Sequence, residues 1–292
     1  MINVTYLKIE VSINEMEDIL SYRGKVRNMY NLGNNYYLME ASDRVSSFDK
    51  HIGIIPGKGV LLNKMSAYWF NKTKHIVDNH LMSYVTKFSL VKKCNPIHIE
   101  FVIRGYITGN TNTSLWSHYK NGCRNYCGLD IKEGLVKNQK LDKPIITPTI
   151  KWDKDIPISK EEILKKYYIS EEELDFMYDK VYKLFEFGQE IASKAGFILV
   201  DTKYEFGKDE NNNIILIDEL HTCDSSRYWI KESYQRRFDA GLEPEKLDKD
   251  CVRDWVKKHC DPYNDKIPSI PDSIIQKAYS NYEYFYNTIL TV

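Results

Sequence analysis

The sequence predicts an α+β protein with a small N-terminal lobe, residues 1–85, and a larger lobe, residues 86–292. Three observations support this fold class. Residues 22–42 contain two runs of strand-favouring residues around an LGNN turn, and residues 197–219 contain two more around the turn KDENNN. Residues 171–195 have the apolar periodicity of a long amphipathic helix. Hairpins and helices therefore occur in separate blocks, as α+β folds require.

The rest of the small lobe is a loop followed by a helix. The segment DRVSSFDKHIGIIPGKG is rich in Gly, Ser and Asp, and we expect it to be a loop. Residues 61–78 predict a helix, because the apolar residues from Leu62 to Ile76 recur at helical spacing.

The larger lobe begins with a strand predicted around Ile97–Ile107. Residues 110–160 are expected to be mostly irregular, with Pro144, Pro148 and Pro157 as breakers, and a loop region of that length is more often functional than idle. A capping box of Ser170 and Glu173 starts the long helix, and Gly196 stands where its C-cap belongs. The C-terminal segment is polar and helical.

Composition argues against several classes of protein. Lys plus Arg equals Asp plus Glu at 41 each, so the chain has no bulk attraction for nucleic acid or an anionic membrane. It has no run of about 18 apolar residues and no apolar N-terminal leader, so we expect a cytoplasmic protein. Six scattered cysteines in a reducing compartment are expected to be free thiols, namely Cys94, Cys123, Cys127, Cys223, Cys251 and Cys260.

The hairpin at 197–219 carries charged residues between apolar flanks. Alternate residues of a strand share a face, so Asp201, Lys203 and Glu205 are expected to point the same way. A hairpin centred on KDENNN places Glu205 about opposite Asp218. Two carboxylates held that close favour a cation between them, and Mg²⁺ takes one or two carboxylates together with phosphate oxygens. The alternative is a solvated charged face, but the flanks FILV and IILI favour a buried hairpin.

Four further segments are candidates for binding anions. Gly24 allows close backbone approach, and Lys25 and Arg27 are expected on one face of a strand, where they could cover nucleotide phosphates. The spacing is neither a P-loop nor GxGxxG, and an exposed basic strand is the alternative.

The histidines show no metal-ligand spacing, no GxSxG nucleophile motif occurs, and the role of His221 stays open.

The other three segments are expected to be loops. Lys58 lies between glycines in IPGKG and could hold a phosphate or carboxylate, and Arg44 in DRVSSFD could hold a carboxylate bidentately. The segment from Thr222 to Arg227 combines hydroxyls with an arginine and could form a monophosphate cradle. A helix N-cap with a surface arginine is the alternative.

Eight motifs in order carry a resemblance to a known family: GKVRNMY, ASDRVSSFD, IPGKG, IEFVIRGYITG, KLDKPIITPT, VDTKYEFG, LIDE and TCDSSRYW. Together they resemble the SAICAR synthetase family of purine biosynthesis, over residues 20–260. The resemblance implies a two-lobed fold with a small antiparallel sheet lobe, a larger α+β lobe and ATP in the cleft between them. It implies that ATP, carboxyaminoimidazole ribonucleotide and L-aspartate react to give the succinocarboxamide, ADP and phosphate.

The resemblance also implies roles for single residues. It places Gly24, Lys25, Arg27 and Glu100 at ATP, and Glu205 and Asp218 on Mg²⁺. It places the ribonucleotide on Arg104, Asp201, Lys203, Asp224, Ser225, Ser226 and Arg227, and Asn110 replaces a serine that many members use on its phosphate. It assigns aspartate binding and site closure to Asp43, Arg44, Ser46, Asp49 and Lys58. The residues implied to act in catalysis are Asp201, Lys203 and Glu205.

The chemistry expected from these roles is activation of a carboxylate. Phosphorylation would give an acyl phosphate that the aspartate amine attacks, with Lys203 neutralising the substrate carboxylate. A small-molecule kinase with the same ATP cleft, and a nucleotide sensor without turnover, are the alternatives. Both a monomer and a homodimer are compatible with the sequence.

Overall fold

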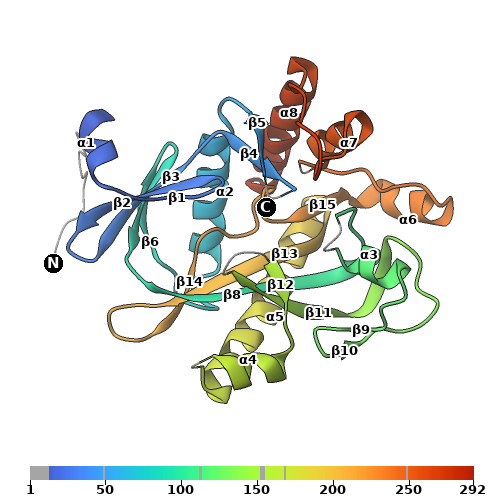
Figure 1. The fold of residues 1–292 in the computed structure, drawn as a ribbon, viewed down its shortest axis with the longest axis horizontal. Helices are drawn as coiled ribbons and strands as arrows, with labels where there is room; N and C mark the ends of the chain where they lie inside the picture. The colour runs from blue at the N-terminus through green and yellow to red at the C-terminus, as the bar shows by residue number, and fades with distance from the viewer. Residues whose placement is uncertain (1–12, 49, 112–113, 152–154, 168, 248) are drawn as a thin grey trace.

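The structure is a computed structural model that describes residues 13–48, 50–111, 114–151, 155–167, 169–247 and 249–292. It contains an N-terminal antiparallel sheet, a larger central antiparallel sheet, and helices packed against both (Figure 1). The α+β class expected from the sequence is confirmed. The substrate-binding candidates lie where the central sheet meets the N-terminal sheet and the C-terminal helices.

The N-terminal sheet has five strands in the order β1–β2–β3–β7–β6. Their bounds are β1 (Leu20–Arg23), β2 (Arg27–Gly33), β3 (Tyr36–Ala41), β6 (Leu81–Val85) and β7 (Phe88–Lys92), and a short helix α1 (Ile13–Asp18) precedes them. The predicted LGNN turn joins β2 to β3, with Asn34 and Asn35 at positive φ, a conformation that Asn tolerates well. Because β7 belongs to this sheet, the sheet continues past residue 85.

The segment expected to be a loop contains a second small hairpin. β4 (Arg44–Ser47) pairs antiparallel with β5 (Lys50–Ile54), so the loop expectation was wrong. The glycines and serines suggested irregular structure, yet Val45, Ser46 and Ser47 are buried in the hairpin. Helix α2 (Lys58–Lys72) follows and begins three residues earlier than expected.

The central sheet has the order β12–β11–β8–β13–β14, with β15 paired to the other end of β13. Its strands are β8 (Asn95–Ile107), β11 (Gln139–Lys151), β12 (Asp155–Pro157), β13 (Phe197–Lys208), β14 (Ile214–Ile217) and β15 (Arg227–Ile230). The predictions of β8 and of the β13–β14 hairpin are confirmed.

The long strand β11 lies in the region expected to be irregular, which corrects that expectation. Its two prolines lie at positions where the missing N–H does not interrupt the hydrogen bonds between β11 and β8. Pro144 falls at the irregularity in register between Lys140 and Ile145. The carbonyl of Pro148 accepts a hydrogen bond from Ile158 at the edge of the sheet. In a strand the nitrogen of a residue points to the same side as its carbonyl, so the nitrogen of Pro148, which lacks a hydrogen, faces the sheet edge and not β8.

Helices cover the sheets and complete the core. α5 (Glu171–Lys194) packs on β13 and β8, and its predicted capping box is present, with Ser170 Oγ accepting from Glu173 N at 3.1 Å. α2 packs on the N-terminal sheet and on α8 (Asp272–Ile289), which also contacts α7 (Asp250–His259). The remaining elements are α3 (Leu115–Lys120), β9 (Asn125–Tyr126), β10 (Leu129–Asp130), α4 (Lys160–Lys166) and α6 (Lys231–Asp239).

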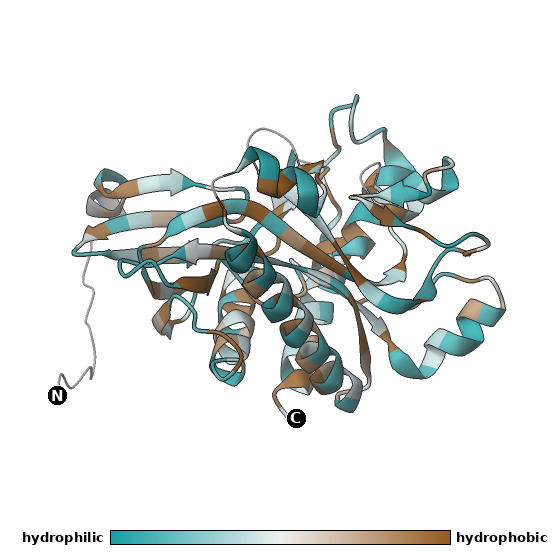
Figure 2. Ribbon diagram, turned by 90° about the horizontal axis from the view of Figure 1, so that it is seen from below, coloured by the Kyte–Doolittle hydropathy of each residue, from teal (hydrophilic) through white to brown (hydrophobic). Residues whose placement is uncertain are grey.

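Hydrophobic residues run along the strands, while the helices seen from below show mostly hydrophilic residues outward (Figure 2). The six cysteines are free thiols, as expected. Within the described residues, no helix is both long and apolar enough to cross a bilayer.

Candidate functional site

The charged residues of β13 lie on one face, as the alternation of a strand requires. Asp201, Lys203 and Glu205 all make ion pairs on that face. The expected register was wrong by one residue, because Glu205 pairs with Ile217 on β14 and Asp218 follows the strand. Asp218 has φ of 67°, so the chain turns there and brings its carboxylate back toward β13. On the other side of β13, the residue directly opposite Glu205 is Glu100 of β8.

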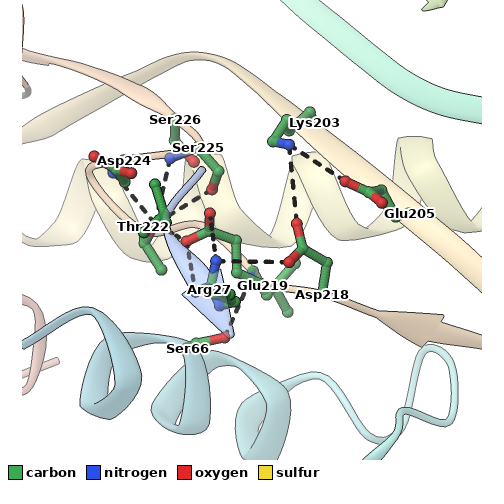
Figure 3. A network of polar contacts seen from close by, with 12 residues as sticks. Arg27, Ser66, Lys203, Glu205, Asp218, Glu219, Thr222, Asp224, Ser225 and Ser226 are labelled. Carbon is green, nitrogen blue, oxygen red and sulfur yellow. Dashed lines mark hydrogen bonds and ion pairs between the residues drawn. The ribbon is translucent and has the colours of Figure 1, made fainter. Parts of the chain in front are cut away.

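Three carboxylates surround the ammonium group of Lys203, and Figure 3 shows two of them, Glu205 and Asp218. Its Nζ lies 2.6 Å from Glu100 Oε1, 3.3 Å from Glu205 Oε1 and 3.8 Å from Asp218 Oδ2. Burial alone would lower the pKa of Lys203, but the neighbouring carboxylates raise it well above its usual value. Lys203 is therefore cationic at neutral pH, and Glu205 and Asp218 converge on one point, as the sequence predicted.

Arg27 extends this group from the N-terminal sheet. Its guanidinium lies 2.9 Å from Glu219 and 3.6 Å from Asp218, and the residue is only 8% exposed (Figure 3). Burial opposes the charged form, but both carboxylates raise the pKa of Arg27. We refer to the residues joined by these ion pairs as the acid-rich cluster: Arg27, Glu100, Lys203, Glu205, Asp218 and Glu219.

Lys25 does not share a strand face with Arg27, which corrects that expectation. Gly24, Lys25 and Val26 form the turn between β1 and β2, and Arg27 is the first residue of β2. The turn is tight: Gly24 N donates to Arg27 O at 2.7 Å, and a Cβ at Gly24 would lie 2.9 Å from that oxygen. The prediction applied the two-residue alternation of a strand to Lys25 and Arg27, but Lys25 lies in the turn, where that alternation does not hold.

A second group of charges surrounds a cavity of about 100 Å³ next to the acid-rich cluster. The predicted segment Cys223–Arg227 forms one wall, and Lys249 and Arg253, at the start of α7, form another. Asp201 also lines it. The structure therefore brings together the predicted hydroxyls and arginine, and adds two cations that sequence reasoning missed.

Buried ion pairs organise this cavity. Lys58 is 0% exposed and lies 3.4 Å from Asp224, whose other oxygen lies 3.3 Å from Lys249. Burial alone would raise the pKa of Asp224, but Lys249 and Lys58 hold it well below its usual range. Burial lowers the pKa of Lys249 to about 8 in spite of Asp224.

Arg227 links the cavity to the central sheet. It forms an ion pair with Asp201, which lies 4.0 Å from Arg104 directly opposite on β8. Arg227 also lies 4.0 Å from Asp250, which binds Arg253 at 2.9 Å. We refer to the following set as the base-rich cluster: Lys58, Arg104, Asp201, Asp224, Arg227, Lys249, Asp250 and Arg253.

Two predicted serines and Asn110 lie beside this cluster. Ser225 and Ser226 line the cavity, and Ser226 Oγ is 2.8 Å from Thr202 Oγ1. Asn110 borders a small adjoining hollow together with Arg227 and Arg253. Its carbonyl oxygen accepts a hydrogen bond from Lys257.

The residues assigned to aspartate are mostly engaged elsewhere. The Asp43 carboxylate accepts from Gly57 N at 3.0 Å and Gly59 N at 2.9 Å, which caps the start of α2. The Arg44 side chain bonds to the β1–β2 turn. Ser46 is buried in β4, and Asp49 lies outside the described residues.

No local signal marked Lys249 and Arg253. They lie in a polar helical stretch whose charges resemble an ordinary solvated helix face, and only the tertiary fold brings that stretch to the cavity. Glu219 was seen only as the end of a strand, although its carboxylate is buried and binds Arg27 and Thr222.

His221 is buried and hydrogen-bonded at 2.5 Å to Tyr204. Burial lowers the pKa of His221 to about 3, so the ring is neutral and has a packing role. Among the described residues, no group of three or more His, Cys, Asp or Glu side chains is arranged to hold a metal ion.

Comparisons with known proteins point to one family. The family model described as SAICAR synthetase matches residues 20–270. The chain is 48% identical over 270 residues to the chloroplastic phosphoribosylaminoimidazole-succinocarboxamide synthase of Arabidopsis thaliana, covering 91% of this chain and 66% of that one. It is 48% identical over 271 residues to the synthase of Legionella pneumophila (strain Paris), covering 92% of this chain and 86% of that one.

Solved structures agree. The SAICAR synthase of Saccharomyces cerevisiae complexed with SAICAR has a TM-score of 0.80 and 30% identity, covering 94% of this chain and 95% of that one. A SAICAR synthetase in complex with ADP shares the fold, with a TM-score of 0.70 and 24% identity, covering 93% of this chain and 97% of that one.

Proposed function

This chain belongs to the SAICAR synthetase family, and from that premise we propose that it uses ATP to join the carboxylate of carboxyaminoimidazole ribonucleotide to the amine of L-aspartate. It is an enzyme, a carbon–nitrogen ligase of purine biosynthesis. The substrates, the metal and the role of each residue are the proposal.

The observation that carries the proposal is the pairing of two neighbouring clusters of opposite charge excess. The acid-rich cluster suits a divalent cation that carries a triphosphate, and the base-rich cluster suits a phosphate monoester with its two negative charges. Strand β13 contributes Lys203 and Glu205 to the first and Asp201 to the second. A ribonucleotide phosphate in the cavity would place the rest of that molecule toward Lys203.

The carboxylates present fit Mg²⁺. Glu205 and Asp218 already converge on one cation, the Lys203 ammonium, within 3.3 and 3.8 Å. Mg²⁺ commonly takes one or two carboxylates and fills its other positions with water and phosphate oxygens, so a larger acidic group is not needed. When bound there, the ion would offset charge on the phosphates during transfer. Arg27 and the turn bearing Lys25 would lie at the same phosphates.

The proposed reaction activates the carboxylate first. A carboxylate oxygen of the ribonucleotide attacks the γ-phosphorus of ATP, and the bond from that phosphorus to the bridging oxygen of ADP breaks. The amine of aspartate then attacks the acyl carbon, the carbon–oxygen bond to phosphate breaks, and the departing phosphate takes the proton lost by nitrogen. Lys203 neutralises the substrate carboxylate, and the protein's main work is alignment and charge stabilisation.

Lys249 and Arg253 join the predicted Ser225, Ser226 and Arg227 as ligands of the ribonucleotide phosphate in this proposal. A cytoplasmic location stays a prediction, since the Arabidopsis relative is named chloroplastic.

An assay for ADP release tests the function. The purified chain is given Mg–ATP with the ribonucleotide, with L-aspartate, with both and with neither. We expect ADP in stoichiometric amounts with the amide product only when both are present. Steady ADP release with the ribonucleotide alone would instead identify a small-molecule kinase, and no release under any condition would contradict both activities.

A further inference from the structure

We propose that Arg44 is a positioning residue that holds the Gly24–Val26 turn in the shape that covers the nucleotide phosphates, and that it is not a ligand of aspartate. The inference rests on the proposed function only for the identity of the nucleotide. The geometry of the turn is independent of it.

The guanidinium of Arg44 reaches across from β4 to the β1–β2 turn. Its Nη2 donates to Gly24 O at 3.0 Å and to Asn28 Oδ1 at 2.7 Å, and its Nε donates to Lys25 O at 3.3 Å. Two of these acceptors are backbone carbonyls, so the contacts depend on the path of the turn and not on its side chains. The planar fork of Arg suits several acceptors at once, which a lysine could not match.

Ser42, two residues before Arg44, holds the same turn. Ser42 N donates to Val26 O at 2.9 Å, and its hydroxyl donates to that same oxygen. All three residues of the turn therefore have their carbonyls bound by the segment Ser42–Arg44. Those contacts hold all three carbonyls of the turn toward Ser42–Arg44.

Asp43, between Ser42 and Arg44, contacts a different segment, the start of α2. Its carboxylate accepts from the amides that begin α2, where Lys58 enters the base-rich cluster. The tripeptide Ser42–Arg44 thus ties the nucleotide turn to the helix that reaches the ribonucleotide cavity. A turn that is already ordered loses less conformational entropy when the nucleotide binds, and the nucleotide affinity rises accordingly.

The experiment compares Arg44→Ala and Arg44→Lys with a matched control, Arg23→Ala. Arg23 lies on β1 beside the same turn, but its guanidinium is half exposed and pairs with Glu17 at 2.9 Å. Three quantities are measured: the dissociation constant of Mg–ADP by calorimetry, hydrogen exchange of the amides of residues 24–28, and the separate KM values for ATP and L-aspartate.

We expect Arg44→Ala to weaken Mg–ADP binding about tenfold, to raise the KM for ATP similarly and to speed exchange in the turn. Arg44→Lys is expected to change the same three quantities in the same direction but by less, because a single ammonium group replaces the guanidinium and cannot reach all of its acceptors. Arg23→Ala should change none of these, and the KM for aspartate should stay within about twofold in every variant.

Three results would overturn the proposal. A selective rise in the KM for aspartate, with Mg–ADP binding unchanged, would make Arg44 a substrate ligand. Equal weakening of Mg–ADP in Arg44→Ala and Arg23→Ala would reduce the effect to loss of charge. If Arg44→Ala does not fold, Arg44→Lys decides: unchanged Mg–ADP binding and unchanged hydrogen exchange in the turn would also overturn the proposal. Binding and exchange need no turnover, so failure of the ligase assay would be seen separately.

Discussion

The two charged clusters share strand β13, yet their compositions are opposite. In the acid-rich cluster, four carboxylates face two cations, and in the base-rich cluster, five cations face three carboxylates. Asp201 and Lys203 are two residues apart, roughly 7 Å along the strand, and belong to different clusters. The net charge of the chain is zero, but the two clusters carry local charge excesses of opposite sign. The sign of each excess is the reason for proposing a cation at the acid-rich cluster and an anion at the base-rich cluster.

The largest expected effect tests the acid-rich cluster. Glu205→Gln or Asp218→Asn should lower turnover on the order of 10³-fold or more, because each change removes one negative charge from the proposed metal position. Turnover is measured by ADP release, and Mn²⁺ binding by titration should weaken in parallel.

The matching control is the fold of these two variants. Each substitution keeps the side-chain shape, so the thermal midpoint should stay within a few degrees. Wild-type activity in either variant would remove the metal assignment, and the contrast between the two clusters would lose its functional meaning.

A smaller effect is expected in the base-rich cluster. Arg227→Ala should raise the KM for the ribonucleotide roughly 100-fold, because a buried charged contact to the phosphate is lost. The KM for ATP should change much less. Initial-rate measurements that vary each substrate separately distinguish the two constants, and an equal rise in both would contradict the division of the site into two clusters.

The smallest effect is a pH dependence from Lys249. Its pKa of about 8 in the folded protein lies below its usual 10.5, so it loses its proton as the pH rises above about 8. The ratio kcat/KM for the ribonucleotide should then fall about fivefold between pH 8 and pH 9.

Lys249→Arg supplies the control for this profile. Arginine keeps its charge throughout this range, so the alkaline fall should disappear if Lys249 is its source. A variant that retains the same fall would assign the titration to another group.

Sequence reasoning succeeded where the signal is local. The alternation in β13, the turn after it and the Ser170 capping box depend on neighbouring residues, and the structure reproduces all three. The convergence of Glu205 and Asp218 was also foreseen, although the register was off by one, since a hairpin pattern cannot show that Asp218 leaves the strand at positive φ.

It failed where tertiary structure decides. Pro144 and Pro148 suggest a break, and only the position of β11 beside a short edge strand explains why a strand survives there. Lys249 and Arg253 lack any motif, because the opposite wall of their cavity, which includes Asp224, the partner of Lys249, comes from a segment more than 20 residues earlier. Arg44 has the chemistry of a carboxylate ligand, but in the fold its acceptors are the carbonyls of a nearby turn.

The contact between Lys58 and Asp224 also constrains how the molecule can move. The ammonium at the start of α2 is wholly excluded from water and lies 3.4 Å from a carboxylate in the loop after β14. Pulling these segments apart would strand a charge in the interior, at a cost of about 3–5 kcal/mol. The start of α2 and the loop after β14 are therefore expected to move together as one unit in any conformational change.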